Sequence, residues 1–386
     1  MSICYFPLSK LPQTGTTIFT IMSAKAKAYG AVNLSQGFPD FDPDERLIEA
    51  LMRALRGSHH QYAPMAGNIL LREKLCEKYH RLWGLQLHPE NEITITAGGT
   101  QALFTAIQAI VKPGDEVILL APCYDSYAPA VQLAGGTCVY YNMLPPDFDI
   151  SWEQLSRLVN EKTRLIIFNS PHNPTASILK KHDIEQLIGL LERHSNLLLL
   201  SDEVYEHIVF DEEGHQSFLR YEPLFQRSMV VSSFGKTYHT TGWKVGYCIA
   251  PETLTTEFRK VHQYNVFSVN SLAQQAFAEI LDYPELYDDL SAFYKQKRNK
   301  FYELFGRTRF KFLPCKGTYF QLADYGDISE MADIDFCDHL VRNYGVAAIP
   351  VSVFYHNAPE SLRLIRFCFA KKDETLAEAA NRLQGL

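Results

Sequence analysis

Short, largely apolar runs alternate with longer amphipathic segments between about residue 90 and residue 250. The runs are EITITAG, EVILLAP, RLIIFNSP, NLLLLSDE, SMVVSSFG and KVGYCIAP. Runs without a regular polar face are typical of strands that are covered on both sides. The segments TQALFTAIQAIV and KHDIEQLIGLLERH between them have the spacing of helices. The sequence therefore predicts an α/β fold with a mostly parallel sheet flanked by helices.

The C-terminal hundred residues follow a different pattern. A helical segment, YKQKRNKFYELFG, precedes the short runs GTYFQLAD, VAAIPVSVF and RLIRFCFA and a closing helix. This pattern predicts a smaller α+β domain, against which we expect the first 45 residues to pack. We expect PELYDDLSAFYKQKRNKFYELF to form one long helix that bridges the two domains. The predicted division is a large domain over 46–284 and a small domain made of 1–45 and 285–386.

Composition excludes several classes of function. The net charge of −7 argues against a nucleic acid or an anionic membrane as the main partner, because both require a basic surface. The eight cysteines are scattered singly, without a CxxC pair or a metal-ligand spacing, so we expect free thiols and no metal site. The sequence shows no secretory signal pattern and no membrane-spanning run, and we expect a cytoplasmic protein.

Polar clusters follow five of the predicted strands. They are AGGTQ, APCY, NSPHNPT, SDEVY and SSFGK. Ligands of open parallel sheets bind outside the carboxyl ends of the strands, so these clusters are candidate site residues. Gly98, Gly99 and Thr100 lie between a strand and a helix, where free backbone amides suit an anion. A tight turn without a ligand explains this cluster equally well when it is taken alone.

Asp202 and Lys236 give the anion site a chemical context. Asp202 follows a run of four leucines, and on its own it is more simply interpreted as a helix cap or a turn residue. Lys236 ends the next predicted strand. A buried carboxylate, a lysine in an apolar pocket and an anion site together suit pyridoxal 5′-phosphate. The lysine forms a Schiff base with its aldehyde, and the carboxylate keeps its ring nitrogen protonated.

The segment SSFGKTYHTTGWKVGY resembles the S-x-x-K…G-W-[RK]-x-G-Y signature of class I/II (fold type I) pyridoxal-phosphate aminotransferases. The resemblance extends over nearly the whole chain. It implies that Lys236 is the Schiff-base lysine and that Ser233 and Lys244 bind the cofactor phosphate. Lys244 stands where many members have arginine, so the charge is kept and the planar fork is lost. The same resemblance places AGGTQ, with Gly99, Thr100 and Gln101, at the cofactor.

Two further loops match the family. NSPHNPTA resembles the N-P-x-N-P-T-G loop, which implies that Asn173 contacts the cofactor ring oxygen and the substrate carboxylate. Ala176 replaces the usual glycine of this loop. SDEVY assigns Asp202 to the ring nitrogen and Tyr205 to the ring oxygen. APCYDSY places Tyr124 where the family stacks an aromatic side chain on the cofactor.

Other segments resemble substrate-binding parts of the family. LRLIRFCFA matches the strand whose arginine binds the α-carboxylate, which implies Arg366 for this role, and Arg363 is expected at the surface. NLSQGFPDF places Gly37 on the substrate side, and TTIFTIM supplies Phe19 to an apolar pocket. HQYAPMAGN carries Tyr62, which in the family reaches the cofactor phosphate of the neighbouring subunit. The resemblance therefore implies a homodimer with shared active sites.

Within the family, the chain is most similar to the methionine, kynurenine and glutamine aminotransferase group. This similarity implies apolar or aromatic amino donors (methionine, phenylalanine, tyrosine, histidine, glutamine or kynurenine) and 2-oxo acid acceptors. A carbon-sulfur β-lyase of the same fold would share every cofactor residue and stays open as an alternative. A non-catalytic regulator would need a basic DNA-binding module, which the sequence lacks. A Rossmann dehydrogenase is excluded because AGGTQ is not G-x-G-x-x-G.

Overall fold

The computed structural model describes residues 8–12 and 14–386, and its larger body is built on a seven-stranded sheet. The strands are β2 (Ile93–Thr96), β3 (Glu116–Ala121), β4 (Thr137–Asn142), β5 (Thr163–Asn169), β6 (Leu198–Asp202), β7 (Ser228–Ser233) and β8 (Gly246–Ile249). Their order is β2-β8-β7-β6-β5-β3-β4. Only β8 runs against its neighbours within this sheet, so the predicted mostly parallel sheet is confirmed.

All six apolar runs form strands of this sheet, whereas β4 was not predicted. β4 lies at the edge of the sheet and pairs only with β3. Its sequence, TCVYYN, is exposed at both ends and mostly half-buried between them. An edge strand of this kind needs no continuous apolar run, which is why the pattern did not indicate it.

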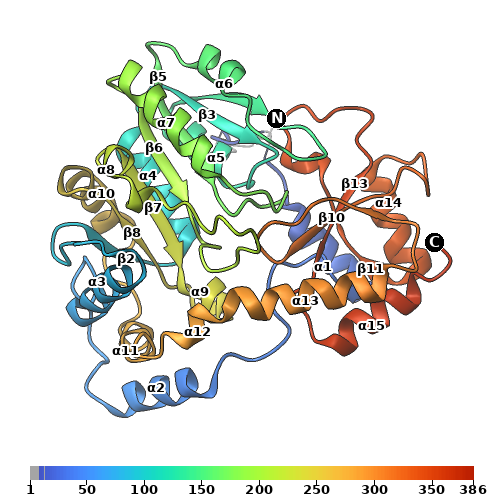
Figure 1. Cartoon of the computed structure of the whole chain (residues 1–386). Coiled ribbons are helices and arrows are strands. Elements are labelled where there is room, and N and C mark those ends of the chain that lie inside the picture. The colour runs from blue at the N-terminus through green and yellow to red at the C-terminus, as the bar shows by residue number, and fades with distance from the viewer. Residues whose placement is uncertain (1–7, 13) are drawn as a thin grey trace, which may run out of the picture.

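Helices cover both faces of the large sheet (Figure 1). The helices of the larger body are α2 (Glu45–Arg56), α3 (Ile69–Trp83), α4 (Gly99–Ile110), α5 (Tyr127–Leu133), α6 (Trp152–Leu158), α7 (Lys181–Arg193), α8 (Glu222–Phe225), α9 (Phe234–Thr237), α10 (Glu252–Asn265) and α11 (Ser271–Ile280). The predicted helices over TQALFTAIQAIV and KHDIEQLIGLLERH correspond to α4 and α7, with ends that agree within one residue.

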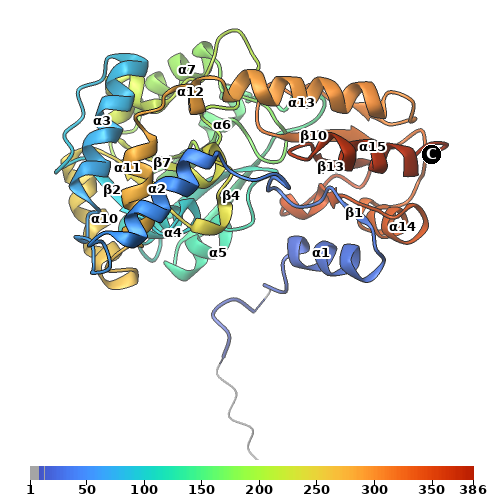
Figure 2. The same cartoon turned by 90° about the horizontal axis from the view of Figure 1, so that it is seen from below.

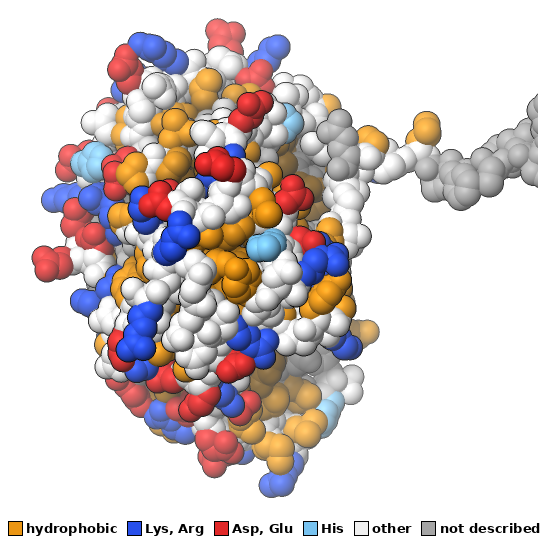
Figure 3. Space-filling view, turned by 90° about the vertical axis from the view of Figure 1, so that its right-hand side faces the viewer, with side chains coloured by type: hydrophobic (Ala, Val, Ile, Leu, Met, Phe, Trp, Pro, Cys, Tyr) orange, Lys and Arg blue, Asp and Glu red, His pale blue; other side chains and the backbone are white. Residues whose placement is uncertain are grey.

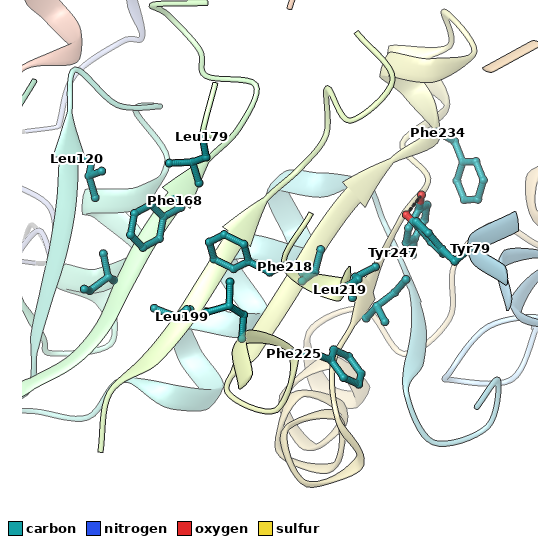
Figure 4. Packing of buried hydrophobic residues seen from close by; sticks show 14 of the residues in the cluster. Tyr79, Leu120, Phe168, Leu179, Leu199, Phe218, Leu219, Phe225, Phe234 and Tyr247 are labelled. Carbon is teal, nitrogen blue, oxygen red and sulfur yellow. Dashed lines mark hydrogen bonds between the residues drawn. The ribbon is translucent and has the colours of Figure 1, made fainter. Parts of the chain in front are cut away.

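Alternate residues of each central strand enter two different cores. Ile118 and Leu120 of β3 belong to one core, and Val117 and Leu119 belong to the other. Figure 4 shows part of the first core, in which the hydroxyl groups of two tyrosines from α3 and β8 meet among apolar side chains. Burial on both faces explains why these strands lack the polar alternation of a half-exposed sheet.

The smaller body holds a four-stranded sheet and a separate parallel strand pair. The sheet has the order β12-β13-β10-β9, and β1 pairs with β11. These strands are β1 (Val32–Asn33), β9 (Lys311–Phe312), β10 (Phe320–Asp324), β11 (Val346–Ala347), β12 (Ile349–Pro350) and β13 (Leu364–Cys368). Helices α1 (Ile18–Ala28), α14 (Asp333–His339) and α15 (Asp373–Arg382) pack around them. The pairing of β1 with β11 confirms that the N-terminal segment packs against the C-terminal part of the chain.

The segment VAAIPVSVF does not form the single strand that its apolar run suggests. The segment divides into β11, which pairs with β1, and β12, which pairs with β13, followed by a 3-10 turn over Ser352–Phe354. The two short strands belong to different sheets. The sequence pattern records only that the whole segment is buried, and it does not indicate which partner each half has.

The long helix expected to bridge the two parts is interrupted. α12 (Glu285–Asp288) and α13 (Leu290–Phe305) are separated by Asp289, whose ψ of −6° turns its carbonyl away from the helix axis. α13 alone extends from the larger to the smaller body, as Figures 1 and 2 show. The predicted connection is therefore present but is made by the second of two helices.

The surface of the smaller body carries charges of both signs. Figure 3 shows Lys and Arg side chains interspersed with Asp and Glu over this face. Such a mixture gives the face no continuous basic area on the residues that the structure describes. In the same described part of the chain, no helix combines the length and the apolar character needed to cross a bilayer.

Candidate active site

A cavity of about 320 Å³ opens where the carboxyl ends of the large sheet meet the smaller body. Its lining includes Phe19, Gly37, Gly99, Thr100, Tyr124, Asn173, Asp202, Tyr205, Ser233, Lys236, Lys244, Phe320 and Arg366. The predicted site residues therefore converge on one cavity, with two exceptions, Tyr62 and Gln101. Segments from Phe19 to Arg366 contribute, so neither body forms the cavity alone.

Lys236 lies on α9, the single helical turn that follows β7 directly. Its Nζ donates hydrogen bonds to the Gly37 carbonyl at 3.2 Å and to the Tyr319 hydroxyl at 3.0 Å. Burial lowers the pKa of the Lys236 ammonium to about 8; the cations Lys244 and Arg366 also lower it, whereas Cys368 and Asp202 raise it. A neutral amine, which can act as a nucleophile or a base, is thus accessible near neutral pH.

Asp202 is the last residue of β6 and is 4% exposed. The Tyr127 hydroxyl donates to its Oδ2 at 2.6 Å, and the Val204 amide donates to its Oδ1 at 3.4 Å. Burial raises the pKa of the Asp202 carboxyl to about 6, although the hydrogen bond from Tyr127 opposes this shift. The carboxylate faces the cavity, where it is able to pair with a protonated ring nitrogen.

The start of α4 is a candidate anion site. Gly98 precedes the helix with a φ of 84°, and no side chain caps the first amide groups of the helix. A Cβ at Gly98 would lie 3.3 Å from the Lys244 ammonium, so a glycine lets this cation approach the backbone. Free helix amides and an ammonium together suit a phosphate group.

The side chain of Gln101 does not reach this anion site. Its Oε1 accepts from the Ala97 amide at 2.9 Å, and its Nε2 donates to Thr105 Oγ1 at 2.6 Å. These bonds brace the turn between β2 and α4. Any contact of Gln101 with a bound group would therefore come from its backbone.

Arg366 comes from β13 and is 1% exposed. Its Nη1 donates to Asn173 Oδ1 at 2.6 Å and its Nη2 donates to the Ser35 carbonyl at 3.2 Å, while its buried Nε has no partner. Burial lowers the pKa of the guanidinium to about 10. No carboxylate among the described residues forms an ion pair with Arg366. A buried cation without an anionic partner is costly unless a ligand supplies the anion.

Aromatic side chains surround the guanidinium. Its Cζ lies 3.8 Å from the ring centre of Phe320, 5.4 Å from that of Phe19 and 5.3 Å from that of Phe354. The position of Phe19 on α1 is held by Gln36, whose Nε2 donates to the Phe19 carbonyl at 2.8 Å. The surroundings of the cation are thus apolar on several sides.

The model of the family described as aminotransferase class I and II matches residues 29–383. The chain belongs to the class I and II aminotransferases. It is 50% identical to the methionine aminotransferase of Escherichia coli K12 over 98% of each chain. It is 30% identical to human kynurenine–oxoglutarate transaminase 1 over 93% of each chain.

Solved structures agree with this assignment. A crystal structure of an E. coli protein with methionine aminotransferase function, 50% identical, superposes with a TM-score of 0.96 and covers 99% of this chain and 100% of that chain. The N-succinyldiaminopimelate aminotransferase of Mycobacterium tuberculosis, 35% identical, gives a TM-score of 0.94 over 98% and 99%. These relatives are all named aminotransferases or transaminases, and this chain is an aminotransferase.

Tyr62 lies outside the cavity of its own chain in this aminotransferase. Its side chain is 81% exposed, and its ring packs edge-on against Phe267 at 5.3 Å. Tyr62 therefore adds nothing to the cavity described above. An exposed tyrosine of this kind is available to a second subunit.

Ala176 stands where the family's loop has glycine, and its backbone is left-handed. Ala176 adopts a φ of 60°, a conformation that glycine reaches without strain. Its amide still donates to the His172 carbonyl at 2.8 Å. Asn173 is held in place by its amide, which donates to Asn169 Oδ1 at 2.7 Å. The loop therefore presents Asn173 to Arg366 despite the substitution.

A buried ion pair lies directly behind the site and was not predicted. Lys78 Nζ contacts Glu206 Oε1 at 2.8 Å, and both side chains are almost fully buried. Glu206 also accepts from Ser232 at 2.9 Å and from Tyr247 at 2.9 Å. Ser232 and Glu206 are the sequence neighbours of Ser233 and Tyr205, which line the cavity. The pair thus connects α3 to the two segments that carry these residues.

Proposed function

We propose that this aminotransferase uses pyridoxal 5′-phosphate and moves the amino group of an apolar or aromatic amino acid to a 2-oxo acid. The donors would be of the methionine, phenylalanine, tyrosine, histidine, glutamine or kynurenine type. The observation that carries the proposal is the meeting, in one cavity, of Lys236, Asp202, an anion site and the unpaired Arg366. The names of the bacterial and human relatives support the same range of donors.

The residues of the cavity fit the cofactor. The anion site, with Gly99, Thr100, Ser233 and Lys244, suits its phosphate, and Gln101 would contribute through its backbone. When bound, pyridoxal 5′-phosphate supplies an aldehyde that an amine can attack and a ring that accepts electrons. The buried guanidinium and the open helix amides are groups that an anionic ligand would satisfy.

The remaining polar residues are assigned to the cofactor ring. Asp202 would pair with the ring nitrogen, and Asn173 and Tyr205 would donate to the ring oxygen. Tyr124 would stack on the ring, and its hydroxyl already lies 3.4 Å from Thr100 Oγ1. Lys236 would bind the cofactor and carry the proton to and from the substrate α-carbon. Its lowered pKa favours this role.

Substrate binding is assigned to Arg366 and the apolar groups around it. The guanidinium would hold the α-carboxylate, with Asn173 as a second contact. Gly37 lines the cavity and would border the substrate. It also lies close to Phe320, since a Cβ at this position would be only 2.7 Å from Phe320 Cζ. The substrate side chain would lie against Phe19.

We expect kcat/KM with methionine or phenylalanine as the amino donor to be at least about tenfold higher than with aspartate. Burial of an apolar side chain gains about 1.5–3 kcal/mol, whereas a second carboxylate beside Phe19 would be left without a cation. Lys236, Lys244 and Arg366, the basic residues of the cavity among those the structure describes, are already assigned to the cofactor and the α-carboxylate. Steady-state rates with the three donors and one common 2-oxo acid test this. Aspartate rates equal to or above the other two would refute the assignment.

We also propose that the active species is a homodimer in which Tyr62 contacts the cofactor phosphate of the partner subunit. The exposure of Tyr62 on the chain surface supports this proposal. The two-fold symmetry of most dimers would place one such tyrosine at each site.

Mixing Tyr62→Phe subunits with Lys236→Ala subunits should restore activity. In a hybrid dimer, one site carries both substitutions and the other carries neither, so that one site works. The expected activity exceeds the sum of the two parent variants, measured after co-expression with two different affinity tags and isolation of the doubly tagged species. Doubly tagged dimers with no more activity than the parents would argue against a shared site.

Two further assignments complete the proposal. We propose a large domain over 46–284 and a small domain made of 1–45 and 285–386, because residues 93–249 form the large sheet and residues 311–368 form the small one. Residues 1–7 and 13 of this division lie outside the described residues. We also propose a cytoplasmic location, since the seven described cysteines are all free.

A further inference from the structure

We infer that Tyr319 and the Gly37 carbonyl aim the lone pair of the neutral Lys236 amine into the cavity, which makes Tyr319 a positioning residue for the reaction. This inference rests on the proposed function. Tyr319 belongs to the segment GTYF ahead of β10, where the sequence pattern indicated only a strand. The inference follows from three hydrogen bonds that join Lys236, Tyr319 and Gly37.

The three groups form a closed triangle. Lys236 Nζ lies 3.0 Å from the Tyr319 hydroxyl and 3.2 Å from the Gly37 carbonyl oxygen. The Tyr319 hydroxyl in turn donates to the same carbonyl at 2.6 Å. A phenol has one proton, and that proton is committed to Gly37. The oxygen of Tyr319 therefore faces Lys236 as an acceptor, as does the Gly37 carbonyl.

Two acceptors determine the direction of a neutral amine. The amine carries two N–H groups and one lone pair in a tetrahedral arrangement. When Lys236 donates its two N–H groups to Tyr319 and Gly37, its lone pair points away from both. Lys236 lines the cavity, whereas Tyr319 is not among its lining residues, so we assign the lone pair to the cavity side of Nζ. A basic nitrogen is thereby oriented toward the place where a substrate α-carbon would lie.

Both acceptors are held rigidly. Tyr319 is fully buried, and its ring packs edge-on against Tyr205 at 5.3 Å and against Phe320 at 4.9 Å. Gly37 lies so close to the Phe320 ring that a Cβ would come within 2.7 Å of Cζ. A glycine is therefore required for its carbonyl to reach Lys236 and Tyr319. The amine is oriented by groups that cannot easily turn away.

A fixed lone pair matters for the proton transfer assigned to Lys236. The amine accepts the proton that leaves the substrate α-carbon, and the electron pair of that C–H bond stays with the substrate. The ammonium that forms keeps its bonds to Tyr319 and Gly37. Orientation of a base before the reaction removes the entropic cost of finding the reactive geometry.

Tyr294 provides a matched control. It is fully buried in the same aromatic cluster, with its ring 5.5 Å from that of Tyr319, and its hydroxyl has no hydrogen-bond partner. Tyr294→Phe removes one hydroxyl from the cluster without touching Lys236. A general packing effect would therefore appear in both Tyr294→Phe and Tyr319→Phe.

The first readout is turnover with methionine and a 2-oxo acid. Tyr319→Phe should lower kcat about 10- to 100-fold, which is part of the roughly 100- to 10,000-fold that a general base contributes, and leave the dissociation constant of pyridoxal 5′-phosphate unchanged. Tyr294→Phe should stay within about twofold of the unchanged protein. Incorporation of 3-fluorotyrosine at position 319 keeps the hydroxyl and should restore kcat, which distinguishes a lost hydroxyl from a folding defect.

The second readout needs no turnover. In the full chain without cofactor, the modification of Lys236 by an amine-reactive reagent is followed against pH by peptide mass spectrometry. Loss of an acceptor for the ammonium should move the midpoint in Tyr319→Phe below that of the unchanged protein. The other groups facing Lys236, namely Asp202, Tyr205, Lys244, Arg366 and Cys368, are the same in both variants. A lower midpoint also makes the amine a weaker base, and a fall of less than about one pH unit can lower the rate at most about tenfold in this way. A larger loss of kcat therefore identifies orientation as the contribution of Tyr319.

The outcomes separate the inference from the proposed function. Equal kcat and equal midpoints in Tyr319→Phe and Tyr294→Phe, in a chain that transaminates normally, overturn the inference alone. An unchanged chain that neither binds pyridoxal 5′-phosphate nor transaminates overturns the proposed function, and the inference with it. A selective loss in Tyr319→Phe that 3-fluorotyrosine repairs supports the inference.

Discussion

Replacement of Lys236 by alanine should lower kcat for transamination at least about 10,000-fold. Alanine removes both the amine that would bind the cofactor and the base that would move the α-proton. Steady-state rates with methionine and a 2-oxo acid, at saturating pyridoxal 5′-phosphate, give the magnitude. Among the described residues, the other lysine of the cavity is Lys244, and its Nζ lies beside Gly98 at the candidate anion site.

A surface lysine gives the control for this experiment. Lys260 is exposed and contacts only Glu257 through its side chain, so Lys260→Ala should leave kcat unchanged. Borohydride reduction of the unchanged holoenzyme should also fix the cofactor on the peptide that contains Lys236. A label on another lysine, or Lys236→Ala with substantial activity, would show that the site has been wrongly assigned.

Arg366→Lys should lower kcat/KM about 100-fold for the amino acid and for the 2-oxo acid alike. Both substrates carry a carboxylate next to the reacting carbon, so both would lose the same contact. A lysine keeps the charge but cannot present two parallel N–H groups, and it would leave Asn173 without its present donor. Loss of a hydrogen bond to a charged group costs about 1.5–3 kcal/mol. Most of the effect should be in KM.

Arg363 serves as the matched control for Arg366. It lies three residues earlier, is half-buried, and its side chain donates only to the carbonyls of Glu360 and Leu362. Arg363→Lys should change kcat/KM less than about threefold. A similar loss in both variants would mean that Arg366→Lys acts through the stability of the small sheet, and a loss for only one substrate would contradict a shared carboxylate site.

Runs of apolar residues in the sequence predicted the central strands of the large sheet. The six apolar runs became central strands because burial on both faces leaves an unbroken hydrophobic segment in the sequence. β4 was not predicted because an edge strand is buried on fewer sides and carries no unbroken apolar run. The break at Asp289 was not predicted because an aspartate within a helical pattern carries no strong stop signal.

The candidate site was predictable to the extent that its residues follow strands. The strand-end rule located Asp202, Asn173 and Lys236 in neighbouring loops, and the structure brings them to one cavity. Tyr127 and Tyr319 were missed because they reach the site through long-range hydrogen bonds. Tyr127 bonds to Asp202 across 75 residues of sequence, and Tyr319 bonds to Lys236 across 83. No local pattern records such contacts. The role of Tyr62 depends on a second subunit and stays a prediction.

The pairing of β1 with β11 affects how the chain folds during its synthesis on the ribosome. Val32 finds its partner Val346 only after roughly 310 more residues have been made, which takes about 15–60 s at ordinary elongation rates. During that interval β1 has no strand to pair with, and Phe19 has no guanidinium to cover. Arg366 is later still, so the nascent chain completes its large sheet well before it can recognise an amino acid. Chaperone binding to the early segment of the nascent chain would be strongest in this interval.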